Sequence, residues 1–170
     1  VTVRKDQIVD ISRAGVYTMT DGRTFQGRQR HLTEHKLLRQ ELMPLSSERS
    51  GELPKSLLEK CTLMDALPLA FCVIELTFDA EGHGVDFVFR YCNPMMAVVE
   101  GVPVADMLNR SFYEVFPDGD RKWLVSCADT ALNGSCHILR DYSREIEKNL
   151  TIHCYQPESG YCACLLLPED

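Results

Sequence analysis

The stretch that most constrains the fold runs from Val85 to Gly101, where an alternating segment passes directly into a short helical one. Its rings Phe87, Phe89 and Tyr91 stand at every second position, which predicts a half-buried strand with all three on one face. This stretch has no obvious acid, base or nucleophile pattern, so it predicts architecture before function.

The change from strand to helix depends on Asn93 and Pro94. Asn93 can accept a backbone N–H as an N-cap, and Pro94 suits the first helical position because its missing donor would be unpaired there anyway. Gly101 offers a left-handed helix end. We expect Asn93 and Pro94 to form a structural hinge, and replacing Asn93 by Ala to cost about 1 kcal/mol through the lost cap.

Five strands are expected, with helices between the second and third. The strand patterns cover Phe71–Phe78, Val85–Cys92, Cys136–Tyr142, Leu150–Gln156 and Tyr161–Leu167. Short helices are predicted after Asn93 and over Pro103–Leu108, and a longer one over Asp120–Asn133 closed by Gly134, while Asn109 stands where a left-handed residue is needed. This order predicts an α+β fold, an antiparallel sheet with helices grouped on one face.

The amino-terminal part predicts a hairpin and a helical linker. Val16–Met19 and Arg23–Gln26 flank Asp21-Gly22, a strong hairpin turn signal. A helix is expected over Thr33–Met43, and another over Pro54–Leu67. Their apolar faces are too large to leave in water, so we expect a homodimer in which these helices take part, with candidate contacts at Leu38, Leu42, Leu57, Cys61 and Met64.

Composition excludes several classes of protein. The 170 residues are 45% hydrophobic and carry a net charge of −7, which argues for one domain with an appendage and against nucleic acid or an anionic membrane surface as a partner. The sequence has no apolar run long enough to span a membrane, so we expect no membrane insertion. Its eight cysteines lie mostly inside helix or strand patterns, which indicates reduced core thiols in a cytoplasmic protein.

Over residues 67–168 the sequence resembles a PAS domain. The resemblance is carried by Arg90-Tyr-Cys-Asn-Pro94 with its following helix, by Leu108-Asn-Arg-Ser-Phe-Tyr-Glu-Val-Phe-Pro117, by Trp123-Leu124 and Leu132-Asn-Gly134, and by the two closing strands. It departs from the family pattern at Asn109, where Gly is frequent, and at the final Leu-Pro-Glu-Asp170. The resemblance implies a five-stranded antiparallel sheet with helices on one face.

A second resemblance lies near the start. Leu32-Thr-Glu-His-Lys36 is similar to the junction that commonly leaves one PAS domain and leads by a helix to the next, although His31 replaces the usual Asp. Residues 1–30 are then the last strands of an upstream PAS domain, or else a local arm that packs on the main domain or on a partner chain. We divide the chain into this segment, a helical linker over residues 31–66, and a PAS domain over residues 67–170.

The resemblance implies a sensory and protein-interaction module that relays a signal, by dimerisation and flanking helices, to an output domain such as a histidine kinase or diguanylate cyclase. We expect no catalytic activity in these residues, because no nucleophile, base and orienting group can be identified together. The alternative is a PAS domain that binds a small-molecule ligand or cofactor in its core.

The candidate ligand-pocket residues are soft, aromatic or branched side chains of the expected core, together with one histidine: Ile74, Phe89, Tyr91, Met96, Val99, Trp123, Leu139 and His153. Burial alone also explains these patterns, and we favour a fully packed core over a ligand cavity. Haem and flavin are disfavoured, because the histidines fall on strands and no photoactive cysteine segment is present. Cys136, His137, His153, Cys154, Cys162 and Cys164 lie near one another in the expected sheet, but we predict no metal site. His153 and Cys154 point to opposite faces, and no Cys-X-X-Cys pair occurs.

Overall fold

The structure is a computed structural model that describes residues 8–11, 16–19, 24–26, 51–80 and 83–169. The helix expected over residues 33–43, with Leu38 and Leu42, lies outside the described residues. So does the expected hairpin turn at Asp21-Gly22.

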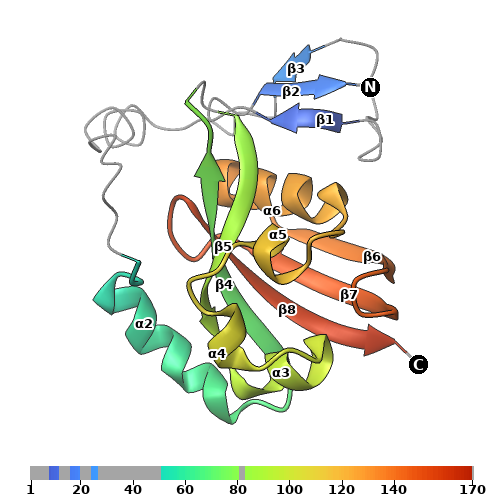
Figure 1. Cartoon of the computed structure of the whole chain (residues 1–170). Helices are drawn as coiled ribbons and strands as arrows, with labels where there is room; N and C mark the ends of the chain where they lie inside the picture. Colours follow the sequence, from blue (N-terminus) through green and yellow to red (C-terminus); the bar gives the residue numbers. More distant parts are fainter. Residues whose placement is uncertain (1–7, 12–15, 20–23, 27–50, 81–82, 170) are drawn as a thin grey trace.

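A five-stranded antiparallel sheet organises the main part of the chain (Figure 1). Its strand order is β5-β4-β8-β7-β6, so that the first and last strands in sequence, β4 and β8, lie side by side. The five predicted strands are confirmed to within two residues at each end. Their bounds are β4 Ala70–Phe78, β5 Gly84–Cys92, β6 His137–Ser143, β7 Lys148–Tyr155 and β8 Tyr161–Glu169.

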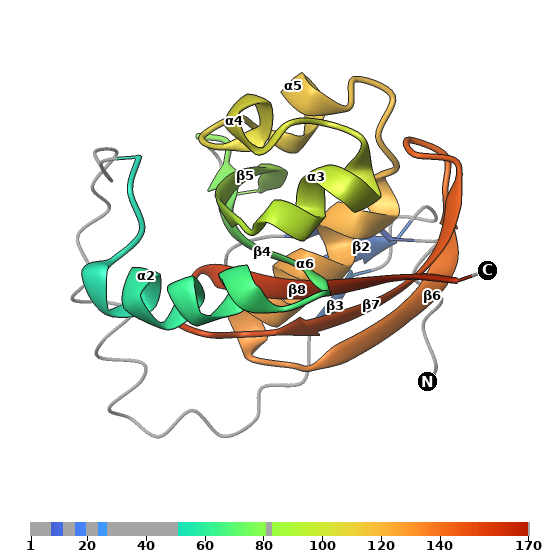
Figure 2. The same cartoon turned by 90° about the horizontal axis from the view of Figure 1, so that it is seen from below.

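The segment between β5 and β6 forms helices on one face of this sheet, as predicted (Figure 2). They are α3 Pro94–Glu100, α4 Val104–Met107, α5 Phe112–Val115 and α6 Arg121–Asn133. Sequence explains their ends. Ser111 and Glu114 form a capping box on α5, and the Asp120 side chain accepts from Lys122 N–H at the start of α6.

Residues with a left-handed backbone conformation lie at the positions that the sequence indicated. Gly101 ends α3 with φ 71° and Gly134 ends α6 with φ 67°. Asn109 follows α4 with φ 61°, a conformation that asparagine tolerates better than most residues. The Asn109 N–H donates to the Phe89 carbonyl at 2.8 Å, so this turn is attached to β5.

The inner face of the sheet and the four helices enclose the larger apolar core. Alternate residues of the strands point into it, including Cys72 and Ile74 from β4 and Ile152 and Cys154 from β7. Phe87, Phe112 and Phe116 add a ring cluster in which Phe87 stacks on Phe112 with centroids 4.7 Å apart. Any internal binding site must therefore be lined by residues of this core.

The predicted alternation of β5 is wrong at Tyr91. The strand pairs Ile74 with Phe89 but Val73 with Tyr91, so Arg90 is an extra residue that forms a bulge. Because a one-residue insertion reverses the faces of all later side chains, Tyr91 points to the outer face and Cys92 to the inner one. The bulged Arg90 donates to Glu75 at 2.9 Å and to the Asn109 side chain at 3.0 Å.

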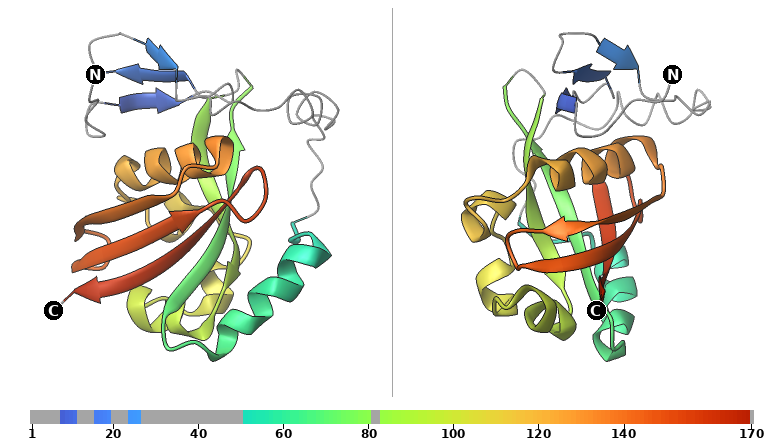
Figure 3. Two further views of the ribbon diagram at one scale, coloured as in Figure 1. Left: turned by 180° about the vertical axis from the view of Figure 1, so that it is seen from behind. Right: turned by 90° about the vertical axis from the view of Figure 1, so that its right-hand side faces the viewer.

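A separate helix covers part of the outer face. The expected helix over Pro54–Leu67 forms as α2 Lys55–Cys61 followed by a tighter 3₁₀ turn, η2 Thr62–Ala66. Leu57 and Cys61 of α2 are buried against outward-facing residues of the sheet, and Met64 packs at the edge of the same cluster. Figure 3, in its right-hand view, shows the sheet between α2 and the helices α3 to α5.

A small three-stranded antiparallel sheet precedes these elements. It consists of β1 Ile8–Ile11, β2 Val16–Met19 and β3 Thr24–Gln26. β2 and β3 pair with Tyr17 opposite Phe25, which confirms the predicted hairpin strands, and β1 adds a third strand beside β2. No helix in the described residues is long and apolar enough to cross a membrane.

Candidate functional site

A cavity lies inside the larger core, between the inner face of the sheet and the helices α3, α5 and α6. It has about 60 Å³ of space for the centres of water-sized molecules, enough for roughly four to six waters. The lining is mostly apolar: Cys72, Ile74, Phe87, Phe89, Met96, Phe112, Trp123, Cys127, Leu139, Leu150, Ile152, Cys164 and Leu166, with Glu100, Ser143 and Glu145 as polar members. A mostly apolar cavity with a few polar groups is the usual form of a small-molecule site.

Glu100 brings a carboxyl group to this cavity from the last position of α3. Burial, reinforced by the nearby Glu145 carboxylate, raises the pKa of Glu100 to about 7, while Lys148 opposes the shift. Near neutral pH this carboxyl therefore exists in both its protonated and ionised forms. It can donate a hydrogen bond to a ligand or accept one.

Glu145, in the turn between β6 and β7, is held differently. Its carboxylate accepts from the Asp120 backbone N–H and from the Ser143 hydroxyl. Burial opposes ionisation, but the hydrogen bonds from Ser143 and Asp120 outweigh it and lower the pKa of Glu145. The cavity wall thus carries one fixed carboxylate and one carboxyl that changes protonation near neutral pH.

Five of the eight predicted pocket residues line the cavity: Ile74, Phe89, Met96, Trp123 and Leu139. Val99 is buried in the same core but is not part of the cavity wall. Two predicted members are misplaced. Tyr91 lies on the outer face because of the Arg90 bulge, and His153 is exposed because the alternation of β7 turns Leu150, Ile152 and Cys154 inward.

The outward Tyr91 connects the sheet to the segment before it. Its hydroxyl donates to the Asp65 carboxylate of η2, and its ring packs against Phe71 with centroids 6.0 Å apart. Burial and this hydrogen bond both raise the pKa of Tyr91. The outer face of the sheet therefore makes a specific contact with the α2–η2 segment, on the side opposite the cavity.

Asn93 does more than the predicted cap. Its Oδ1 accepts from Met96 N–H at 3.3 Å, as expected for an N-cap, and also from Phe71 N–H at 3.0 Å. Its Nδ2 donates to the carbonyls of Met64 at 2.9 Å and Leu69 at 2.8 Å. Fully buried, this side chain joins η2, β4 and α3 next to the cavity.

The strand order and the placement of the helices decide the fold. Five antiparallel strands in the order β5-β4-β8-β7-β6, with all helices between β5 and β6 on one face, form a single curved layer under a helical cover. The chain has a PAS-like fold. In this PAS-like domain the cavity lies between the helices and the sheet.

Solved structures that resemble this chain were found, among them the following one. The PAS-like domain is similar to the photoactive yellow protein domain of the sensor histidine kinase Ppr from Rhodospirillum centenum, with a TM-score of 0.44 and 12% sequence identity. The likeness covers 62% of this chain and 90% of that one. No family model matches the sequence, and no curated protein matches it.

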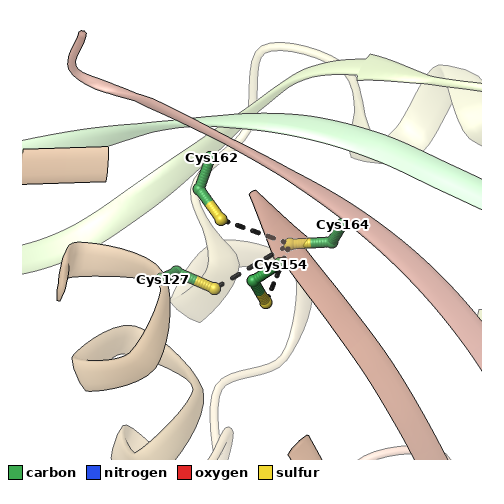
Figure 4. Close-up of side chains that lie close together, drawn as sticks. All are labelled: Cys127, Cys154, Cys162 and Cys164. Carbon is green, nitrogen blue, oxygen red and sulfur yellow. Dashed lines mark hydrogen bonds between the residues drawn. The ribbon is translucent and has the colours of Figure 1, made fainter. Parts of the chain in front are cut away.

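Among the described residues, His137 and His153 do not join a metal-binding arrangement with the predicted thiols. His137 pairs with Asp129 of α6, His153 is exposed, and Cys136 is exposed just before β6. Four other groups do converge, because Cys154, Cys162 and Cys164 of the sheet meet Cys127 of α6 (Figure 4). Sequence reasoning considered the three strand thiols with the histidines but placed Cys127 only in the core stripe of its helix. Cys162 and Cys164 lie two residues apart on one strand, so their side chains point to the same face of the sheet. This spacing was the sequence signal for a cluster of thiols.

Proposed function

We propose that this chain is a sensory module in which a small molecule occupies the cavity on the inner face of the sheet. The observation that carries the proposal is the cavity itself, a mostly apolar space inside a PAS-like fold with the Glu100 carboxyl in its wall. The preferred ligand class is a compact apolar molecule with one hydrogen-bonding group, such as an amine or hydroxyl. A carboxylate on the ligand is disfavoured, because Glu100 and Glu145 would repel it.

The outer face offers a route for the signal. α2 packs on β4, β5 and β8, the strands whose other face lines the cavity, and Tyr91 bonds to Asp65 across this contact. A ligand that moves these strands would change the packing of α2. The output domain, a histidine kinase or diguanylate cyclase, would lie outside these residues, and catalysis would belong to it.

The remaining assignments extend the same proposal. The first sheet, β1 to β3, would be the end of an upstream PAS domain, with residues 31–66 as the linker. The reduced state of all eight cysteines suits the cytoplasm.

The experiment follows Trp123, the only tryptophan of the chain, which lies in the cavity wall. Phenethylamine and phenylacetate are titrated into the 170-residue chain while tryptophan emission is measured. We expect phenethylamine to bind more tightly. Leu139→Phe, which fills the cavity, should weaken binding at least tenfold, about 1.4 kcal/mol.

The matched control is Ile138→Phe, because Ile138 is 62% exposed on the adjacent position of the same strand. It should bind like the unsubstituted chain. Equal binding by the two variants, or no change of Trp123 emission with either compound, would contradict ligand binding in this cavity. Hydrogen exchange of the α2 amides, measured with and without the bound compound, tests the relay to the outer face.

A second candidate function is dimerisation, and exposed leucines favour it. Leu58 and Leu63 of the α2–η2 segment and Leu69 just before β4 are 43%, 75% and 38% exposed, an apolar surface beside the covered outer face. Leu57, Cys61 and Met64, expected at a dimer contact, pack within the chain instead. Sedimentation at about 10 μM should give a dimer that Leu63→Glu dissociates and that Val98→Glu, on α3, leaves intact. A monomeric unsubstituted chain would argue against this function.

A further inference from the structure

Cysteines form a row across the inner face of the sheet. Cys92 of β5 pairs with Cys72 of β4, Cys72 with Cys164 of β8, and Cys164 with Cys154 of β7. His137 of β6 stands opposite Cys154 at the end of the row. All four thiols of this row are buried in the larger core.

Beside Cys164 and Cys154, two further sulfurs complete a compact group. Cys162 lies two residues before Cys164 on β8 and faces the same way, and Cys127 points toward them from α6 (Figure 4). The Sγ of Cys164 is 3.9 Å from that of Cys127, 3.8 Å from that of Cys154 and 3.6 Å from that of Cys162. The sulfur atoms of all four residues lie within 4.8 Å of one another.

These separations match the outline of one tetrahedral sulfur site. With metal–sulfur bonds of about 2.3 Å, the sulfurs of a regular tetrahedron are about 3.8 Å apart. The three distances from Cys164 bracket this value, and small inward rotations would shorten the remaining ones. Packing alone requires each side chain to fill space, and it does not require four sulfurs from three elements to share one small volume.

Two other interpretations fit the distances less well. A disulfide has its sulfurs about 2.05 Å apart, far closer than any pair here, and the four residues are free thiols. An iron–sulfur cluster holds several irons and inorganic sulfides between its cysteine ligands, so it needs them set more widely than these. One ion in the centre of the four sulfurs is what the spacing accommodates.

The surroundings suit an ion that enters from the cavity. Cys127 and Cys164 both line the cavity, so a hydrated ion can reach two of the sulfurs before it meets the other two. A thiol binds a metal ion through its deprotonated sulfur, so each of these sulfurs that binds an ion releases its proton to water.

We propose that Cys127, Cys154, Cys162 and Cys164 form a binding site for one thiophilic metal ion, with Zn²⁺ as the ion that four tetrahedral sulfurs suit best. The site connects α6 to β7 and β8 from within the core. It is independent of the proposed small-molecule function, because the apolar remainder of the cavity and the Glu100 wall are unaffected by an ion at this end.

The experiment measures metal binding by the complete 170-residue chain with all thiols reduced. Native mass spectrometry after addition of Zn²⁺ should find one ion per chain. Co²⁺ in its place should give the strong visible absorption of a tetrahedral site and the near-ultraviolet charge-transfer bands of thiolate ligands. Zn²⁺ should then bleach these bands by displacement.

Variants locate the ion. Cys164→Ala and Cys127→Ala remove ligands from different elements. Loss of a residue that only hydrogen-bonds to a ligand weakens metal binding roughly 10- to 100-fold, so the loss of a ligand itself should weaken Co²⁺ binding by more than this. Cys92→Ala is the matched control, a thiol buried in the same core and the same row but outside the group of four. It should keep the spectrum and the affinity, and circular dichroism establishes that each variant is folded.

Two results would overturn the proposal. One is a reduced chain that binds no Zn²⁺ and develops no thiolate bands with Co²⁺. The other is an unchanged Co²⁺ spectrum in Cys164→Ala and Cys127→Ala, which would assign the ion to another site such as the exposed Cys136. Binding of phenethylamine to the cavity is measured separately, so a failure of either proposal is distinguishable from a failure of the other.

Discussion

Asn93 illustrates how much a single buried amide can hold together. A cap requires one acceptor bond, yet Asn93 makes four side-chain hydrogen bonds that use both its oxygen and its nitrogen. The partners are backbone groups of η2, of α3 and of the chain at the start of β4. The residue therefore acts as the junction of η2, β4 and α3.

Replacing Asn93 by Ala should lower the free energy of unfolding by roughly 3–5 kcal/mol, well above the cost of about 1 kcal/mol expected for a lost cap. The increase comes mainly from the Phe71 N–H and the Leu69 carbonyl, which lose their bonds to the Asn93 side chain, while the Met64 carbonyl still accepts from the Leu67 N–H. Urea unfolding followed by circular dichroism measures the change.

Asn93→Asp separates the two roles, because it keeps the acceptor of the cap and loses the amide donors. It should remain strongly destabilised. A loss close to 1 kcal/mol for Asn93→Ala would mean that water replaces the missing bonds and that the residue is only a cap.

At the scale of an element, α2 shows how one helix divides its residues between two surroundings. Leu57 is 2% exposed and packs on the outer face of the sheet, whereas the adjacent Leu58 is 43% exposed. Both are leucines of the same helical turn, so their intrinsic helix propensities are equal. Any difference between them measures docking and not helix formation.

Leu57→Ala should destabilise the domain by about 2–5 kcal/mol, while Leu58→Ala should change its stability by no more than about 0.5 kcal/mol. Thermal or urea unfolding of the two variants, compared with the unsubstituted chain, tests this. Similar small effects of both changes would indicate that α2 is not held on the sheet in solution.

For the whole molecule, the cavity makes stability depend on pH through Glu100. The pKa of this carboxyl is about 7 in the folded chain, above its ordinary value of 4.5, because burial disfavours the charged form. The folded state consequently prefers the protonated group. The stabilisation is complete below about pH 4.5 and is lost as the pH rises through about 7.

Glu100→Gln, which stays uncharged, should remove this part of the pH dependence. At pH 8 the variant should be more stable than the unsubstituted chain by up to about 3 kcal/mol. Contact of the ionised carboxylate with water makes this difference smaller. The difference should narrow at pH 4.5, where Glu100 is protonated in the folded state and about half protonated in the unfolded state. Urea unfolding at the two pH values is the measurement, and an equal difference at both would contradict a raised pKa.

Local sequence determined the elements of this protein, because alternation, caps and turns depend on neighbouring residues. The five strands, the Asn93 cap, the left-handed Asn109 and the hairpin strands β2 and β3 all follow from such signals. The PAS-like order of strands and helices follows from their succession along the chain. Five members of the cavity wall could be predicted in the same way, because strand and helix periodicity assigns them to the buried face.

Only the tertiary structure decided which elements meet, because register and bulges depend on partner strands. The bulge at Arg90 arises from pairing with β4, and it alone sends Tyr91 to the outer face. Three of the four bonds of Asn93 need backbone groups from η2 and from the start of β4, which lie 22 to 29 residues away in sequence. The four sulfurs likewise converge only because β7 pairs with β8 and α6 crosses above them, so a residue classed as an ordinary core cysteine becomes part of a site.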